Sequence, residues 1–176
     1  MLSLTAIGNW ELAVLASIAG ATGTVEERDA QITRSGLYAE YPAILAAYLE
    51  LVLDGDDAES LEALKRAVFI AWYGFQASPT VSGIAELPES AIRRLLEALD
   101  DAIAAGRVDD ELRSMLAWYD QQFGYVFEHF GPVRALAGFI ASADPQQVAA
   151  LRGDPARRDG RGQLGRYWAS LPPAAA

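Results

Sequence analysis

The apolar residues of the chain recur mostly at intervals of three and four positions, the spacing that places side chains on one face of an α-helix. The clearest example begins at Pro88 and ends at Gly106. Its apolar face consists of Ile92, Leu95, Leu96, Leu99 and Ile103. No stretch of the sequence shows a persuasive two-residue alternation of the kind that marks a half-buried strand. The pattern therefore predicts an all-α fold.

The same criteria predict a series of helices joined by short connections. Their boundaries are indicated by proline at helix starts, glycine after helix ends, and hydroxyl or acidic residues that cap first turns. The predicted helices cover approximately residues 8–20, 42–53, 58–76, 88–105, 109–130, 132–140 and 145–152, and 24–34 is either a short polar helix or an ordered loop. Short connections are typical of a bundle, so we expect a single globular bundle of about six to eight helices.

The composition changes at Gly153. Residues 153–176 are rich in glycine, proline and arginine, and this composition predicts an irregular C-terminal tail. The expected organisation is therefore one all-helical domain over residues 1–152, followed by the irregular tail over 153–176.

Charge is distributed unevenly between these two parts. Residues 1–151 hold nine Lys/Arg and 22 Asp/Glu, a net charge of −13, whereas residues 152–176 hold five Arg and two Asp, a net charge of +3. The acidic body should repel nucleic-acid phosphates, so we expect no DNA or RNA binding by the body. It should attract a basic partner protein, although moderate acidity also simply keeps a protein in solution.

The tail combines four arginines with Tyr167 and Trp168. Arginine beside aromatic residues can bind single-stranded nucleic acid. Next to so acidic a body, however, we expect the tail either to lie on the body with Trp168 docked or to extend freely.

Candidate catalytic chemistry is sparse. The chain has no cysteine, which excludes disulfides, thiolate catalysis and Cys-ligated metals. Its single histidine, His129, could transfer protons together with Glu128 or Asp120. A di-iron bundle needs Glu-x-x-His on two helices, and this sequence has no such spacing. We expect no metal and no cofactor, and an enzyme is the third-ranked hypothesis.

Two Ala-Trp-Tyr segments raise a sharper question. Trp72 falls on the apolar stripe of its helix, while Tyr73 lies on another side with Phe69 and Gln76. In the second segment Tyr119 belongs to the core stripe, and the adjacent stripe consists of Trp118, Gln122, Tyr125 and His129. This flank is either the edge of the core or a binding surface, because Trp and Tyr often anchor interfaces. The candidate binding residues are thus Trp118, Gln122, Tyr125, His129 and Tyr73.

The loop at 77–88 could fold over that flank and enclose an aromatic pocket. The N-terminal apolar run, residues 13–21, is too short to span a bilayer and lacks a basic segment before it, so no membrane association and a cytoplasmic location are expected.

These observations favour a non-enzymatic protein-interaction module. The most concrete version is an acidic inhibitor of the immunity or antitoxin type that binds a basic partner protein. The alternative is a helical small-molecule-binding or sensory domain with an aromatic pocket.

Overall fold

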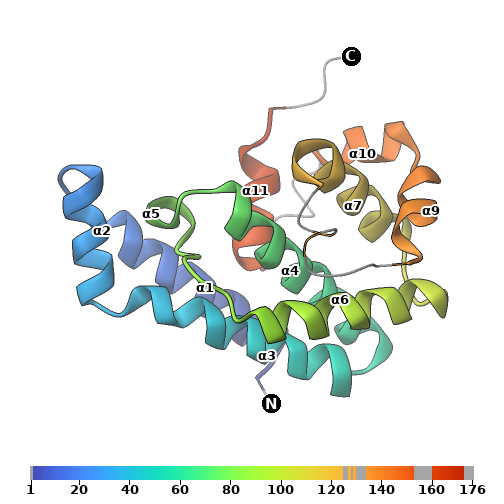
Figure 1. Ribbon diagram of the computed structural model, residues 1–176, viewed down its shortest axis with the longest axis horizontal. Helices are drawn as coiled ribbons and strands as arrows, with labels where there is room; N and C mark the ends of the chain where they lie inside the picture. The colour runs from blue at the N-terminus through green and yellow to red at the C-terminus, as the bar shows by residue number, and fades with distance from the viewer. Residues whose placement is uncertain (1, 125–126, 128, 130–133, 153–159, 173–176) are drawn as a thin grey trace.

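The computed structural model describes residues 2–124, 127, 129, 134–152 and 160–172, and these residues form an all-α bundle without strands (Figure 1). Eight of the ten described α-helices have seven residues or more, so the predicted fold class is confirmed. The helices are α1 (Leu4–Ala19), α2 (Val25–Arg34), α3 (Glu40–Asp54), α4 (Asp57–Gln76), α5 (Pro79–Ser82), α6 (Glu89–Ala104), α7 (Asp110–Phe123), α9 (Leu136–Ala141), α10 (Pro145–Leu151) and α11 (Gly162–Ser170), with a 3₁₀ turn, η1, at Leu37–Ala39.

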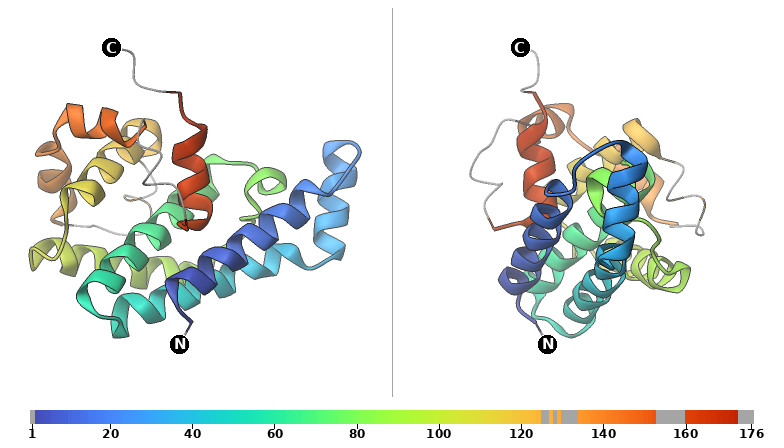
Figure 2. Two further views of the ribbon diagram at one scale, coloured as in Figure 1. Left: turned by 180° about the vertical axis from the view of Figure 1, so that it is seen from behind. Right: turned by 90° about the vertical axis from the view of Figure 1, so that its left-hand side faces the viewer.

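Helix α4 is the centre of the bundle. Every residue from Ala63 to Trp72 is buried, which fits the apolar character of its second half on all sides. The helix packs against α3, α5, α6, α7 and α11. In the left view of Figure 2, α11 lies beside α1 and in front of the central helix α4.

The helix starts follow the predicted capping signals. The Thr24 side chain accepts a hydrogen bond from the Glu27 amide while the Glu27 carboxylate accepts one from the Thr24 amide, so the capping box at α2 is confirmed. Asp56 caps α4 through the Glu59 amide at 2.9 Å. Segment 24–34 is therefore a helix rather than a loop.

The predicted irregular tail was wrong for residues 162–170, which form α11. Two glycines with positive φ, Gly160 and Gly162, let the chain turn sharply into this helix. Leu164 and Trp168, four residues apart, then bury one face of it. Burial of this face outweighs the poor helix propensity of a glycine-rich segment. Residues 153–159 and 173–176 lie outside the described residues.

Two other boundaries differ from the prediction. Helix α7 ends at Phe123 with Gly124 as its C-cap, short of the predicted end at 130. The segment 77–90, predicted as a loop, contains α5, which Gly83 ends in the left-handed conformation at φ 77°.

No single helix among the described residues has the length and apolar composition needed to cross a membrane. By length and composition alone, one pair passes this test jointly, Val25–Arg34 with Leu37–Asp54, and it is bent by 69°.

Candidate functional site

Trp118 lies under the C-terminal helix and is half-buried. Its indole Nε1 donates a hydrogen bond to the Tyr167 hydroxyl at 2.8 Å, and its ring centroid lies 6.0 Å from that of Trp168. The guanidinium of Arg152 lies 5.3 Å from the Trp118 ring centroid, within cation–π range. The part of the predicted flank that Trp118 forms is thus largely covered by α11 and by the residue that follows α10.

Of the other predicted site residues, Tyr73 is brought near Trp118, because both contact Tyr167. Gln122 and His129 are exposed, and Tyr125 lies outside the described residues. Tyr73 is on a different helix and is half-buried, stacked on Phe69 with ring centroids 5.0 Å apart. Tyr73 also contacts Tyr167, at 5.4 Å between centroids.

The two Ala-Trp-Tyr segments meet in one aromatic cluster. Trp72 and Tyr119 stack with ring centroids 4.3 Å apart, the closest ring pair of the cluster. The cluster comprises Phe69, Trp72, Tyr73, Trp118, Tyr119, Tyr167 and Trp168. The apolar stripe that contains Trp72 predicts core packing for the first segment, and Trp72 is indeed fully buried. The position of Tyr167 in this cluster was not predicted; of the two alternatives for the tail, the docked one holds for Trp168, which is buried.

A buried polar network ties the start of α11 to the body. Glu11 on α1 is 1% exposed, and its carboxylate accepts hydrogen bonds from the Tyr48 hydroxyl and from the Gln163 amide, the latter at 2.9 Å. The Gln163 side chain accepts from the Tyr41 hydroxyl at 2.6 Å and donates to the Ser82 carbonyl at 3.0 Å. The Glu11 carboxylate therefore satisfies a free amide at the helix start, where negative charge is favoured.

Burial raises the pKa of Glu11 from 4.5 to about 7, against the opposing effects of the two hydrogen bonds and of Arg66. A carboxyl group with this pKa could exchange protons near neutrality. Glu11 is not among the residues that line the described pockets, however, and its two oxygens already accept hydrogen bonds from the protein. We therefore interpret Glu11 as structural.

An ionic network lies beside this polar one. The Arg161 guanidinium pairs with Glu62 and with Glu111, each at 2.7 Å. Lys65 pairs with Glu111 at 2.6 Å and with Asp109 at 2.7 Å. Attraction to Arg161 and Lys65 keeps the pKa of Glu111 below its usual value, although burial opposes this. Sequence reasoning missed this arrangement, because its members are as much as 99 residues apart.

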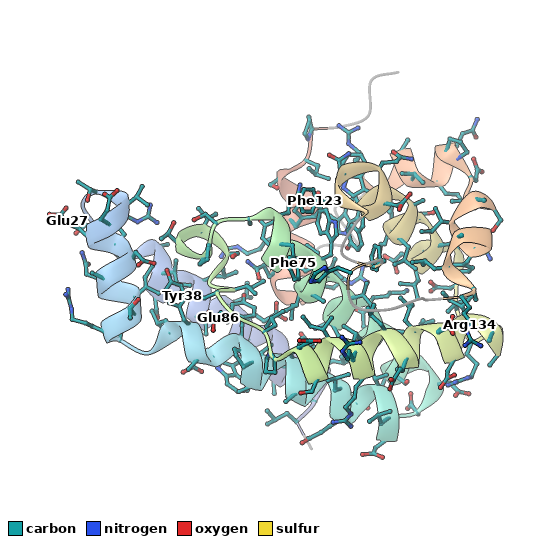
Figure 3. All side chains as sticks on the ribbon, viewed as in Figure 1. Glu27, Tyr38, Phe75, Glu86, Phe123 and Arg134 are labelled. Atoms are coloured by element: carbon teal, nitrogen blue, oxygen red, sulfur yellow. The ribbon has the colours of Figure 1, made fainter. Side chains whose placement is uncertain are left out.

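Three hollows of the surface are large enough to be considered as binding sites. The α3–α4–α6 groove, near the ends of α3 and α6 and the start of α4, has a volume of about 410 Å³. The Trp118 pocket, between α7, α9 and α10, has about 300 Å³ and includes Arg152. The Phe75 pocket has about 430 Å³ and includes Glu86, which Figure 3 shows on the segment after α5.

The predicted enclosure of Trp118 by the 77–88 loop was wrong. No residue of 77–88 lines the Trp118 pocket, and this segment instead lines the Phe75 pocket. Helix α5 packs on α1 and α2, where Arg28 donates a hydrogen bond to the Thr80 carbonyl at 3.1 Å. These contacts hold the segment away from α7.

Acidic side chains lie exposed at the surface more often than basic ones, although Glu11 is buried. Lys65 and Arg66 are buried and Arg161 is nearly so, all in ion pairs with carboxylates. In the described part of the chain, 14 Asp and Glu residues are exposed, compared with six Arg. Among the described residues, exposed acidic side chains therefore outnumber exposed basic ones by more than two to one.

Metal binding and similarity to known proteins add no further candidate. Among the described residues, no group of three or more His, Asp and Glu side chains is arranged to hold a metal ion. No protein-family model, no curated protein and no solved structure matches this chain.

Proposed function

We propose that the protein is a non-enzymatic interaction module that binds a basic partner protein through its acidic surface. The observation that carries this proposal is the excess of acidic over basic side chains among the exposed described residues. Buried or nearly buried cations are neutralised by carboxylates of the same chain, and most of the acidic side chains are left facing solvent. Such a surface attracts a basic protein and accelerates its encounter.

The most concrete form of the proposal is an inhibitor of the immunity or antitoxin type, which masks the basic surface of its partner. A tightly interlocked bundle suits this role, because a rigid surface loses little conformational entropy when it binds. The proposal retains the cytoplasmic location expected from the sequence.

The test is affinity capture from the native cell lysate with the immobilised protein, at low and at moderate salt. Captured proteins are identified by mass spectrometry and then produced in pure form for direct binding measurements. We expect a basic protein that is lost at moderate salt, because screening weakens attraction between exposed charges. Capture of only acidic or neutral proteins, or of none, would refute the proposal.

The Trp118 pocket supports a second candidate, a small-molecule-binding domain. It combines apolar walls with the indole of Trp118, the guanidinium of Arg152 and the carboxylate of Asp120, which suits a flat apolar ligand with polar groups at its edge. Native mass spectrometry of the purified protein tests it. A retained ligand that is lost in Trp118→Ala would favour this candidate over the first.

A further inference from the structure

The α3–α4–α6 groove combines an apolar floor with carboxylates at its rim. It is lined by Val52, Leu53, Asp57, Ser60, Leu61, Leu64, Ala98, Asp101, Ala102, Gly106, Arg107 and Val108. Its volume of about 410 Å³ lies in the range of roughly 300–1,000 Å³ that is usual for ligand clefts. Leu53, one of the lining residues, is 56% exposed and offers apolar surface to a partner.

Asp101, at the rim of the groove, is not stabilised by its position in its helix. It lies in the last turn of α6, where the negative end of the helix dipole disfavours a carboxylate. Its side chain is exposed and makes no ion pair or hydrogen bond with a described residue. By contrast, Asp57 lies in the first turn of α4, where a carboxylate stabilises the helix. Local structure therefore gives Asp101 no stabilising role at this helix end.

We propose that this groove is the place where the basic partner docks, and that the partner inserts one apolar side chain flanked by arginine or lysine. This inference rests on the proposed function and adds its location. The apolar floor buries the inserted side chain, and Asp57 and Asp101 face the flanking cations across the rim. Arg107 is the single cation among the described residues that line the groove, so it opposes such a partner.

The direct test uses two synthetic peptides of equal charge, Arg-Arg-Trp-Arg-Arg and Arg-Arg-Gly-Arg-Arg, both capped at their ends. Each is titrated into the isotopically labelled full chain, and amide chemical shifts are followed by NMR. We expect the tryptophan peptide to shift amides in 52–64 and 98–108. It should bind about 10- to 100-fold more tightly than the glycine peptide, because its indole becomes buried.

Charge variants with matched controls separate the groove from the acidic surface as a whole. Asp57→Asn/Asp101→Asn removes two exposed carboxylates at the groove and should weaken the tryptophan peptide about tenfold. Glu26→Gln/Glu86→Gln removes two exposed carboxylates elsewhere, one of them also from a first helical turn, and should change its affinity less than twofold. Arg107→Ala should strengthen binding.

The locations of these control residues suit the comparison. Glu27, next to Glu26, marks α2 at the opposite end of the molecule from Arg134 and the end of α6 (Figure 3). Leu53→Gln provides a further variant whose folding is not at risk, because the side chain is already exposed. It should reduce binding of the tryptophan peptide more than that of the glycine peptide.

The outcomes distinguish this inference from the proposed function. Amide chemical-shift changes that spread over all acidic faces would refute docking in the groove, as would an equal loss of peptide affinity in the groove variant and the control variant. Either result would still be consistent with binding through the acidic surface as a whole. If neither peptide shifts any amide, both the groove and the proposed function are overturned.

Discussion

The carboxylate of Glu11 accepts a hydrogen bond from the backbone amide of Gln163, although the two residues are 152 positions apart in the sequence. Glu11 lies near the middle of α1, and Gln163 is the second residue of α11. This contact fixes the C-terminal helix on the first helix of the bundle, where α11 covers the aromatic cluster of α4 and α7. Burial of the Glu11 carboxyl, which raises its pKa to about 7, also makes the stability of the fold sensitive to pH.

Glu11 should make the protein less stable as the pH rises. Its pKa is about 7 in the fold and 4.5 in the unfolded chain, so the folded state binds the proton more tightly. The stability that Glu11 contributes is fully present below about pH 4.5 and is lost as the pH rises through about 7. The free energy of unfolding should fall by on the order of 3 kcal/mol in total. Urea unfolding across this range should show a decline in wild type that is much weaker in Glu11→Gln. Glu50→Gln, an exposed control, should follow wild type. Parallel pH profiles for wild type and Glu11→Gln would contradict this interpretation.

Arg161 should stabilise the fold through its two carboxylate partners. Arg161→Gln leaves Glu62 and Glu111 without this cation, and loss of one member of a buried pair typically costs about 3–5 kcal/mol. We expect the lower end of this range, since both carboxylates keep some contact with solvent. Arg166→Gln changes an exposed arginine of α11, the helix that follows Arg161, and should cost less than about 0.5 kcal/mol. Equal free energies of unfolding for the two variants would show that the Arg161 network contributes nothing.

Gly162 should tolerate no side chain. Its φ is +56°, and a Cβ atom there would lie 2.5 Å from Oε1 of Glu11. Gly162→Ala should therefore displace the start of α11 and increase hydrogen exchange at the Gln163 and Leu164 amides. Gly160→Ala is the matched control, because its φ is +74° and nothing lies within 4 Å of the added atom. The free energy of unfolding of Gly160→Ala should fall only by the cost of the backbone strain, about 1–3 kcal/mol. Protection of the Gln163 amide in Gly162→Ala would contradict the predicted clash.

Trp118 and Tyr167 should be energetically coupled. Trp118→Phe removes the donor of their 2.8 Å hydrogen bond, and Tyr167→Phe removes its acceptor. Each change should cost about 0.5–1.5 kcal/mol, and the double variant should cost less than the sum. Additive free energies of unfolding would show that the hydrogen bond does not stabilise the docked helix.

The helical fold was predictable from the sequence because most helices are amphipathic and carry their own capping residues. The capping box of Thr24 and Glu27 is an example, since it involves only four consecutive residues. Helix α11 was missed because its stability depends on distant partners. Its two glycines predict a loop by local propensity, and Arg161 and Gln163 reveal their roles only when Glu62 and Glu11 are placed beside them.

The candidate site was predicted less well than the fold. The spacing of Trp118 and Gln122 places them on one flank of a helix, but helix periodicity does not tell which neighbour covers that flank. The structure covers Trp118 with Tyr167 and leaves Gln122 exposed. The α3–α4–α6 groove was not predicted from the sequence, because its lining residues come from three helices and from the connection to a fourth.

The central proposal, an acidic surface that binds a basic protein, is tested most directly by calorimetry on the captured partner at increasing salt. The proposal expects the dissociation constant to rise steeply with salt, and to rise further in Asp57→Asn/Asp101→Asn than in Glu26→Gln/Glu86→Gln. A dissociation constant that does not change with salt, for a partner whose binding surface is not basic, would contradict it.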